Sequence, residues 1–179
     1  MALKSHFQFK FSCVTGWCDV YLTKIKTLAE AKNECSRMKM SGKQVVFTNG
    51  CFDILHPGHT RYLSAARELG DFLVVAINSD ESVRMIKGPK RPILEQAARA
   101  ELVAALESVD LVLIFEEDNP LRVIQDLLPD TLVKGGDWAE DKIIGAEVVK
   151  EGGGEVKRIP FATGFSTTDI LERVVERYT

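Results

Sequence analysis

Short runs of apolar residues alternate with helix-like segments along most of the chain, and this alternation limits the possible folds most strongly. Apolar strands separated by helices are typical of a parallel sheet that is buried on both faces. We therefore predict an α/β fold with a doubly wound parallel sheet of about five strands and helices on both faces. The predicted strands are Gln44–Thr48, Phe72–Asn78, Val109–Phe115, Thr131–Lys134 and Val156–Ile159.

The segments between these strands carry the spacing and end signals of helices. The first, Thr23–Met40, is predicted from a modest apolar stripe and is followed by a Ser-Gly stop. Its stripe consists of Ile25, Leu28, Ala29, Ala31 and Cys35. The later predicted helices are Gly58–Leu69, a short one from Ser79 or Asp80, Pro92–Leu106, Pro120–Leu128, Ile143–Glu151 and Thr167–Arg177.

Two parts are expected along the chain: a lead-in over residues 1–22 and a domain over 23–179 whose first helix occupies 23–41. In the lead-in, Phe7, Phe9 and Phe11 alternate with polar residues. This pattern fits either an extended linker or a short strand that contacts another subunit.

Composition narrows the functional classes. The 179 residues have a mass of 19.9 kDa, a net charge of −3 and a pI of about 5.7. This size suits one domain, and the charge argues against a wide basic surface for nucleic acid. The apolar runs are too short to cross a bilayer. The four cysteines show no C-x-x-C pair, and no secretory signal opens the chain, so we expect a cytoplasmic protein with reduced thiols and no membrane partner.

Ligands of such sheets bind beyond the carboxyl ends of the strands, near the point where strand order reverses. The segments that should meet there are Asn49–Pro57, Asn78–Arg91, Glu116–Asn119, Gly135–Asp141 and Phe161–Thr168.

The strongest functional signal follows the first predicted strand. Two of only three histidines, His56 and His59, flank a Pro-Gly pair at an expected helix start. A helix start offers free N–H groups and partial positive charge, and imidazoles can donate to phosphate oxygens, so this turn is typical of a phosphate site. There are two alternatives. The histidines could be unrelated to each other, or the pair could bind a metal ion, although no third ligand is evident nearby. The chain contains neither a Walker phosphate loop nor a G-x-G-x-x-G motif after a strand.

Three later segments carry groups suited to a polyanion, each with an ordinary structural alternative. Lys87, Lys90 and Arg91 lie in a turn-rich loop that could close over a triphosphate or simply face solvent. The Gly-Gly-Asp sequence ending at Asp137 could approach a nucleotide or form a common turn. The Ser-Thr-Thr sequence from Ser166 could bind phosphate or only cap the last helix.

The sequence from Thr48 to His59, Thr-Asn-Gly-Cys-Phe-Asp-Ile-Leu-His-Pro-Gly-His, resembles the signature of the HxGH nucleotidyltransferase superfamily. Further segments, Val75–Asp80, Lys87-Gly88, Arg91–Ile93, Ala104–Glu107, Leu132–Asp137, Gly153–Val156 and Ser166–Thr168, are similar to its heptose 1-phosphate adenylyltransferase branch. The resemblance covers about Ile25 to Val175. It implies a Rossmann-like sheet and an enzyme that joins a nucleoside triphosphate to a phosphorylated acceptor and releases pyrophosphate.

The resemblance also implies roles for individual residues. The implied catalytic residues are His56, His59 and Lys87. The implied nucleotide-binding residues are Thr48, Asn49, Gly50, Cys51, Phe52, Gly58, Arg91, Asp137, Ser166, Thr167 and Thr168. The implied acceptor-binding residues are Asp53, Lys134 and Trp138. No residue is expected to bind a metal directly, and Mg²⁺ should be held mainly by the phosphates of ATP.

The expected reaction is transfer of adenylate from ATP to D-glycero-β-D-manno-heptose 1-phosphate by direct attack on the α-phosphorus. The same chemistry with another base or acceptor, as in glycerol-3-phosphate cytidylyltransferase or FAD synthetase, is one alternative, and a nucleotide-binding module without activity is another. The expected partners are ATP, a sugar phosphate and a separate sugar kinase that supplies it. A homodimer or larger assembly is also expected.

Overall fold

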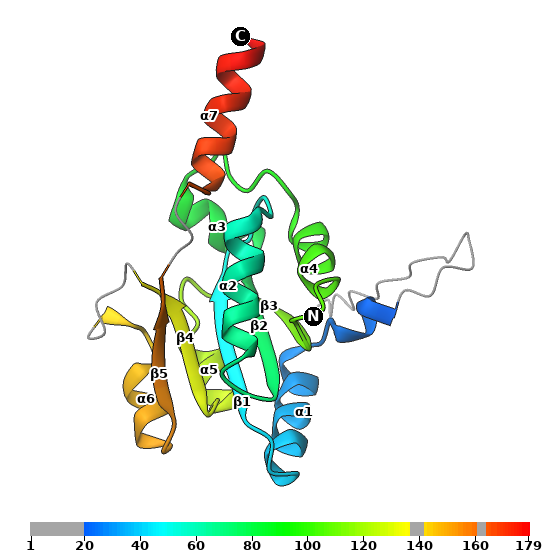
Figure 1. Cartoon of the computed structure of the whole chain (residues 1–179), viewed down its shortest axis with the longest axis vertical. Coiled ribbons are helices and arrows are strands. Elements are labelled where there is room, and N and C mark those ends of the chain that lie inside the picture. Colours follow the sequence, from blue (N-terminus) through cyan, green and yellow to red (C-terminus); the bar gives the residue numbers. More distant parts are fainter. Residues whose placement is uncertain (1–19, 137–141, 161–163) are drawn as a thin grey trace, which may run out of the picture.

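The computed structural model describes residues 20–136, 142–160 and 164–179, and these form an α/β fold around a five-stranded parallel sheet (Figure 1). The strand order is β3-β2-β1-β4-β5. The predicted fold class is thereby confirmed. The strands are β1 (Val45–Gly50), β2 (Phe72–Asn78), β3 (Leu111–Phe115), β4 (Thr131–Gly135) and β5 (Glu155–Ile159).

Helices connect the strands. The described part of the chain begins with a 3-10 turn, η1 (Val20–Lys24), which crosses the predicted domain boundary at residue 22. Lys24 Nζ donates to the backbone oxygen of Val109 at 2.7 Å, so this turn packs on the domain. The helices are α1 (Leu28–Met40), α2 (Pro57–Arg67), α3 (Asp80–Lys87), α4 (Gln96–Ala104), α5 (Leu121–Leu127), α6 (Ala146–Glu151) and α7 (Thr167–Tyr178).

The predicted first helix was wrong in its first turn. Helix α1 begins at Leu28 because Thr27 and Glu30 form a capping box, in which each side chain accepts a hydrogen bond from the other's backbone N–H. Ile25 precedes the helix and bridges to Val112 of β3, and Ala29 is exposed. The apolar stripe of α1 therefore begins later than predicted and includes Met38, which is buried.

Two other predicted helices also begin later than expected. Helix α4 starts at Gln96 because the backbone N–H groups of Ile93 and Leu94 bond to the side chain of Asp53 instead of starting a helical turn. Helix α6 starts at Ala146 because Gly145 has a left-handed backbone, with φ 87°.

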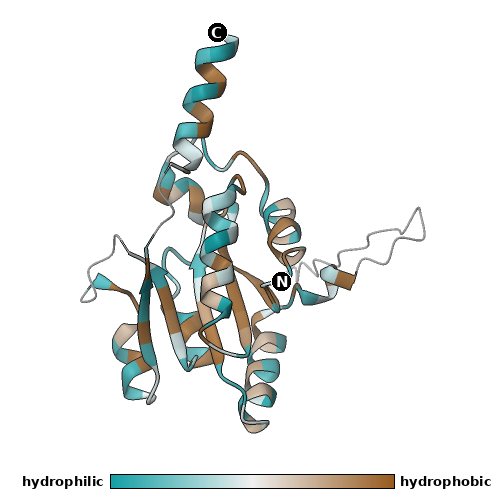
Figure 2. Ribbon diagram, in the orientation of Figure 1, coloured by the Kyte–Doolittle hydropathy of each residue, from teal (hydrophilic) through white to brown (hydrophobic). Residues whose placement is uncertain are grey.

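Alternate residues of each strand pack on opposite faces of the sheet, and each face has its own hydrophobic core. Val45 and Phe47 of β1 pack with α1, α5 and α6, whereas Val46 packs with α2 and α4. Figure 2 shows the apolar residues concentrated along the strands between these two helix layers. The burial of both faces explains the uninterrupted apolar runs in the sequence.

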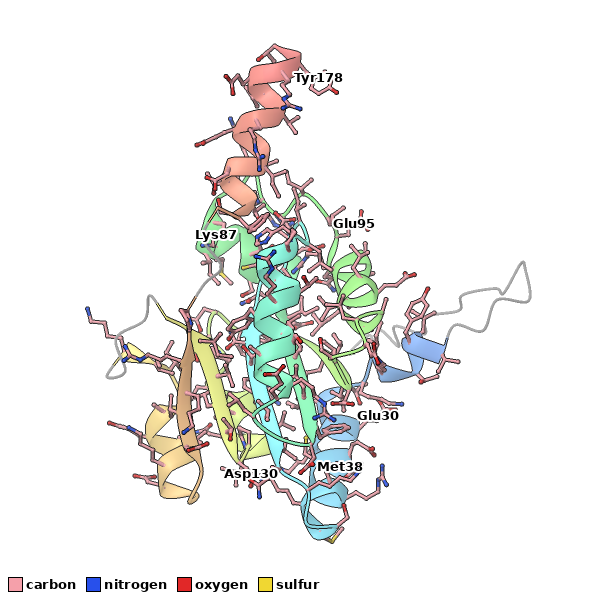
Figure 3. The ribbon with its side chains drawn as sticks, in the orientation of Figure 1. Glu30, Met38, Lys87, Glu95, Asp130 and Tyr178 are labelled. Carbon is pink, nitrogen blue, oxygen red and sulfur yellow. The ribbon has the colours of Figure 1, made fainter. Side chains whose placement is uncertain are left out.

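Strand order reverses beside β1, which pairs with β2 on one side and β4 on the other. Lys87 and Glu95 lie at the end of the sheet where the parallel strands finish, and Asp130 and Met38 lie at the opposite end (Figure 3). Helix α7 projects beyond the first of these ends (Figure 1). In the described ranges, none of the helices has the length and apolar character needed to cross a membrane.

Candidate active site

The two histidines of the predicted phosphate turn stack on each other at the start of α2. Their ring centroids are 3.8 Å apart and their planes differ by 17°. His56 occupies the N-cap position and Pro57 the first helical position, and no side chain caps this helix start. The Nδ1 atoms of both rings are buried without a hydrogen-bond partner among the described residues. A helix start without a side-chain cap and two stacked imidazole rings thus lie together, an arrangement suited to phosphate binding.

Burial keeps both rings neutral near pH 7. Desolvation, with a smaller contribution from the neighbouring His56, lowers the pKa of His59 to about 4, because burial disfavours the charged ring and two stacked cations would repel each other. The backbone of Ile54 offsets part of this effect, although Nδ1 itself makes no hydrogen bond to a described residue. Desolvation also lowers the pKa of His56, against smaller opposite effects of a backbone hydrogen bond and of the Asp169 charge. Each ring therefore presents one N–H donor at neutral pH.

The residues around the histidines hold the rings in place. A Cβ atom at position 58 would lie 2.9 Å from the His56 ring, so only glycine fits beneath that ring. The Phe52 ring packs against His59 with centroids 5.2 Å apart. Phe52 has a left-handed backbone, with φ 47°, which a non-glycine residue adopts only under constraint from its surroundings. The turn between β1 and α2 is therefore held in one shape by contacts outside it.

Asp53 supplies one of these contacts. Its side chain is 1% exposed and forms an ion pair with Arg91, and it accepts hydrogen bonds from the backbone N–H groups of Ile93 and Leu94 at 2.7 and 2.9 Å. Both carboxylate oxygens are therefore engaged inside the protein. This geometry differs from the expectation that Asp53 contacts the acceptor: in this structure Asp53 joins the histidine turn to the basic loop, and Arg91 is its partner.

Lys134 and Asn49 lie side by side at the ends of β4 and β1, on either side of the reversal in strand order. Lys134 Nζ donates a hydrogen bond to Asn49 Oδ1. Desolvation lowers the pKa of Lys134 to about 8, and the nearby Cys51 opposes this only slightly. An ammonium that is partly buried beside a neutral amide is well suited to bind an anionic group.

Cys51 and Lys87 lie near each other behind the histidine turn. Burial raises the pKa of the Cys51 thiol, and the positive charge of Lys87 opposes that rise most among the neighbouring groups. The thiol is therefore protonated at neutral pH, and a protonated thiol is a poor nucleophile. Lys87 ends α3 with an exposed side chain at the same end of the sheet (Figure 3).

The Ser-Thr-Thr segment opens α7, and its first residue is a structural cap. Ser166 Oγ accepts a hydrogen bond from the backbone N–H of Asp169 at 3.0 Å. Phe165 lies next to the histidine turn: a Cβ atom placed on Gly58 would be 3.3 Å from the Cβ atom of Phe165. The Arg61 guanidinium lies 5.3 Å from the centre of the Phe165 ring. The structure therefore places the start of α7 beside α2. The predicted contacts Asp137 and Trp138 lie outside the described residues.

Thr48 differs from its predicted role as a nucleotide contact. Its side chain is fully buried, and its hydroxyl hydrogen-bonds to the Tyr62 hydroxyl at 2.8 Å, so it belongs to the core between β1 and α2. Sequence reasoning missed Arg99, which is fully buried in α4 and bonded to the histidine turn. A signal was present: Arg99 precedes the buried Val103 by four residues, on the apolar face of an Ala-rich helix.

The described residues contain no group of three or more His, Cys, Asp or Glu side chains that could hold a metal ion. The imidazole pair, the helix start and the surrounding cations can bind and stabilise phosphate oxygens. The arrangement thus fits chemistry at a phosphate group.

Residues 47–173 match the family model described as cytidylyltransferase-like. The chain belongs to the cytidylyltransferase-like family. The matched region contains the histidine turn, the basic loop and the Ser-Thr-Thr segment, and the resemblance to nucleotidyltransferases predicted from the sequence is confirmed.

Two curated relatives of this cytidylyltransferase-like chain share half of its aligned residues. Bifunctional protein HldE of Trichlorobacter lovleyi is 51% identical over 157 residues, which are 88% of this chain and 32% of that protein. Bifunctional protein HldE of Citrifermentans bemidjiense is 51% identical over 156 residues, with 87% and 32% covered. The chain thus spans about a third of the length of the curated relatives it matches.

Solved structures share the fold. The lipopolysaccharide core biosynthesis protein from Thermoplasma volcanium has a TM-score of 0.56 and 30% identity, with 68% of this chain and 98% of that chain covered. Pantoate-beta-alanine ligase from Francisella tularensis has a TM-score of 0.55 and 13% identity, with 85% and 77% covered. The second likeness concerns the cytidylyltransferase-like fold alone.

Proposed function

We propose that this protein is an adenylyltransferase that joins ATP to D-glycero-β-D-manno-heptose 1-phosphate, giving ADP-heptose and pyrophosphate. The observation that carries the proposal is the stacked histidine pair at the uncapped start of α2. Identity of about half to the HldE proteins supports it, as does the likeness to a lipopolysaccharide core biosynthesis protein. The proposal that heptose 1-phosphate is the acceptor rests on the resemblance of the later sequence segments to the heptose 1-phosphate adenylyltransferase branch.

In the proposed mechanism, an oxygen of the acceptor phosphate attacks the α-phosphorus of ATP, the new P–O bond forms, and the bond to pyrophosphate breaks. A sugar phosphate is already ionised at neutral pH, so the reaction requires no general base. Catalysis then consists of positioning the substrates and stabilising charge. His56 and His59 donate to the α-phosphate oxygens as charge builds up there. A bound polyanion would also raise the pKa of both rings and strengthen these hydrogen bonds.

Of the other proposed site residues, some bind the leaving pyrophosphate and one binds the acceptor phosphate. Lys87, Ser166 and Thr167 bind the leaving pyrophosphate, using an exposed ammonium, hydroxyl groups and the start of α7. Lys134 binds the acceptor phosphate at the ends of the central strands. Mg²⁺ would neutralise part of the triphosphate charge and would be held by phosphate oxygens and water.

The acceptor would have to come from a sugar kinase, since the reaction consumes a sugar already phosphorylated at its anomeric carbon. The cytoplasmic location expected from the sequence belongs to this proposal, as does a homodimeric or larger assembly.

A pyrophosphate-release assay tests the proposal. ATP and CTP are each supplied with heptose 1-phosphate, glycerol 3-phosphate or FMN, with Mg²⁺ present. We expect release only with ATP and heptose 1-phosphate, together with ADP-heptose identified by mass spectrometry. Pyrophosphate release with another nucleotide and acceptor would assign the protein to a different reaction of the same family. No pyrophosphate release with any combination would support a nucleotide-binding module without activity.

A further inference from the structure

Arg99 is a charged side chain completely removed from solvent, and it makes three directional contacts. Its guanidinium donates to the backbone oxygen of Leu94 at 2.9 Å, to that of Cys51 at 2.6 Å and to the carboxylate of Asp80 at 2.7 Å. Its side chain is 0% exposed, whereas that of Asp80 is 23% exposed. Burying a guanidinium costs free energy, and it persists only where its hydrogen bonds are satisfied.

The three contacts join segments that are distant in the sequence. Cys51 is in the turn after β1, Asp80 begins α3 after β2, and Leu94 precedes α4. Asp53 makes a second connection between the same turn and the segment before α4, through Ile93 and Leu94. The turn that leads to the histidines is therefore fastened at two points, to α4 through Arg99 and to the segment before α4 through Asp53.

The contact with Cys51 continues to the histidines through Phe52. Phe52 follows the carbonyl that Arg99 holds, has the left-handed φ of 47°, and packs its ring 5.2 Å from that of His59. A peptide group in this position cannot rotate while its oxygen is bound to a rigid guanidinium. The carbonyl–guanidinium bond thus restrains the backbone from which the Phe52 ring packs against His59.

We propose that Arg99 is a positioning residue for the proposed transfer reaction: it holds the Cys51 carbonyl and the α3 carboxylate so that the turn through Phe52 keeps His56 and His59 stacked toward the substrate. This inference rests on the proposed function only for the reaction, because the positioning itself is a property of the free protein. Lysine cannot replace arginine here, since a single ammonium does not reproduce the planar fork that reaches three acceptors.

The first test compares Arg99→Lys with Arg67→Lys as the matched control. Arg67 ends α2 at its far end, where it pairs with Asp110 at 2.9 Å and donates to the backbone oxygen of Gly70. We expect Arg99→Lys to lower kcat for pyrophosphate release about 10- to 100-fold with little change in the KM for ATP, because small misplacements of catalytic groups act on the transition state. Arg67→Lys should leave both constants within about twofold, as expected of a partly exposed ion pair.

A double-mutant cycle separates positioning from a general loss of structure. If Arg99 acts through the histidines, Arg99→Lys should lower kcat by no more than about twofold in a His59→Ala background, where that route is already lost. If the effects of the two substitutions multiply, or if folded Arg99→Lys retains the wild-type kcat, the proposal is overturned. Circular dichroism establishes the folded fraction of each variant.

A readout that needs no substrate distinguishes failure of this proposal from failure of the proposed function. Titration of the histidine side chains by NMR should find the pKa of His59 near 4 in the wild type and closer to the ordinary 6.5 in Arg99→Lys, because the loosened ring admits water. An unchanged value refutes the positioning role, whatever the substrate. Should Arg99→Lys not fold, Asp80→Asn decides the question: it weakens one anchor and should move the His59 pKa in the same direction by less, and no movement overturns the proposal.

Discussion

Lys134 offers the sharpest prediction, because its environment places a change of charge within the working pH range. Its ammonium is desolvated at the ends of β1 and β4, its pKa is lowered to about 8, and its partner is the neutral Asn49. If it binds the acceptor phosphate, it does so only when protonated. The acceptor is fully ionised above pH 7, since the second pKa of a phosphate monoester is about 6.

The magnitude follows from the fraction of protonated enzyme. With a pKa of about 8, Lys134 is about 90% protonated at pH 7 and about 10% at pH 9. The ratio kcat/KM for the acceptor reports groups of the free enzyme, so it should fall about tenfold across this range. Losing a hydrogen bond between charged groups costs about 1.5–3 kcal/mol, so the neutral form contributes little to the observed rate.

The assay is pyrophosphate release at saturating ATP and limiting acceptor between pH 7 and 9. Lys134→Arg should abolish the alkaline fall, because a guanidinium stays protonated throughout. Lys134→Met should give a low value of kcat/KM at every pH. A flat wild-type profile, or the same fall in Lys134→Arg, would refute the assignment of Lys134 to the acceptor phosphate.

Three further predictions concern catalysis and stability. His59→Ala should lower kcat about 10²- to 10³-fold while circular dichroism stays unchanged, the loss expected for one oxyanion donor, and near-normal turnover would contradict its role. Asp53→Ala leaves Arg91 without its charged partner and should lower the free energy of unfolding by about 3 kcal/mol in urea titrations; an unchanged midpoint would show that the pair adds no stability. Thr27→Ala removes the α1 capping box and should cost about 1 kcal/mol of stability with kcat unchanged, and a drop in kcat would mean that α1 affects the site.

Side-chain capping distinguishes the start of α2 from the start of α7 as a place to bind phosphate. At the start of α7, the Ser166 side chain accepts a hydrogen bond from the backbone N–H of Asp169. Helix α2 has Pro57 at its first position and no side-chain cap. A cap must be displaced before phosphate can replace it, while the start of α2 needs no rearrangement. In the proposed mechanism, the histidine turn is therefore the centre of the site, and α7 contributes from beside it.

The strands, the fold class and the histidine turn were readable from the sequence because their signals are local. A strand buried on both faces needs an unbroken apolar run, and β2 was predicted with the bounds it has, Phe72–Asn78. The pattern of His56, Pro57, Gly58 and His59 lies within four residues, so its geometry depends mainly on the helix that it begins. Helix starts were less accurate, since Asp53 captures the N–H groups before α4 from outside the segment.

Only the tertiary structure decided how the charged residues pair. Asp53 meets Arg91 across 38 positions of sequence, Arg99 meets Cys51 across 48, and Lys134 meets Asn49 across 85. These contacts depend on strand order and register, which place β4 beside β1, and local periodicity does not contain that information. Composition shows only that the 23 Lys and Arg residues are slightly outnumbered by the 26 Asp and Glu residues. The fold determines which cations hold the histidine turn in shape and which stay without a carboxylate partner among the described residues, because desolvation and ion pairing depend on what surrounds each group.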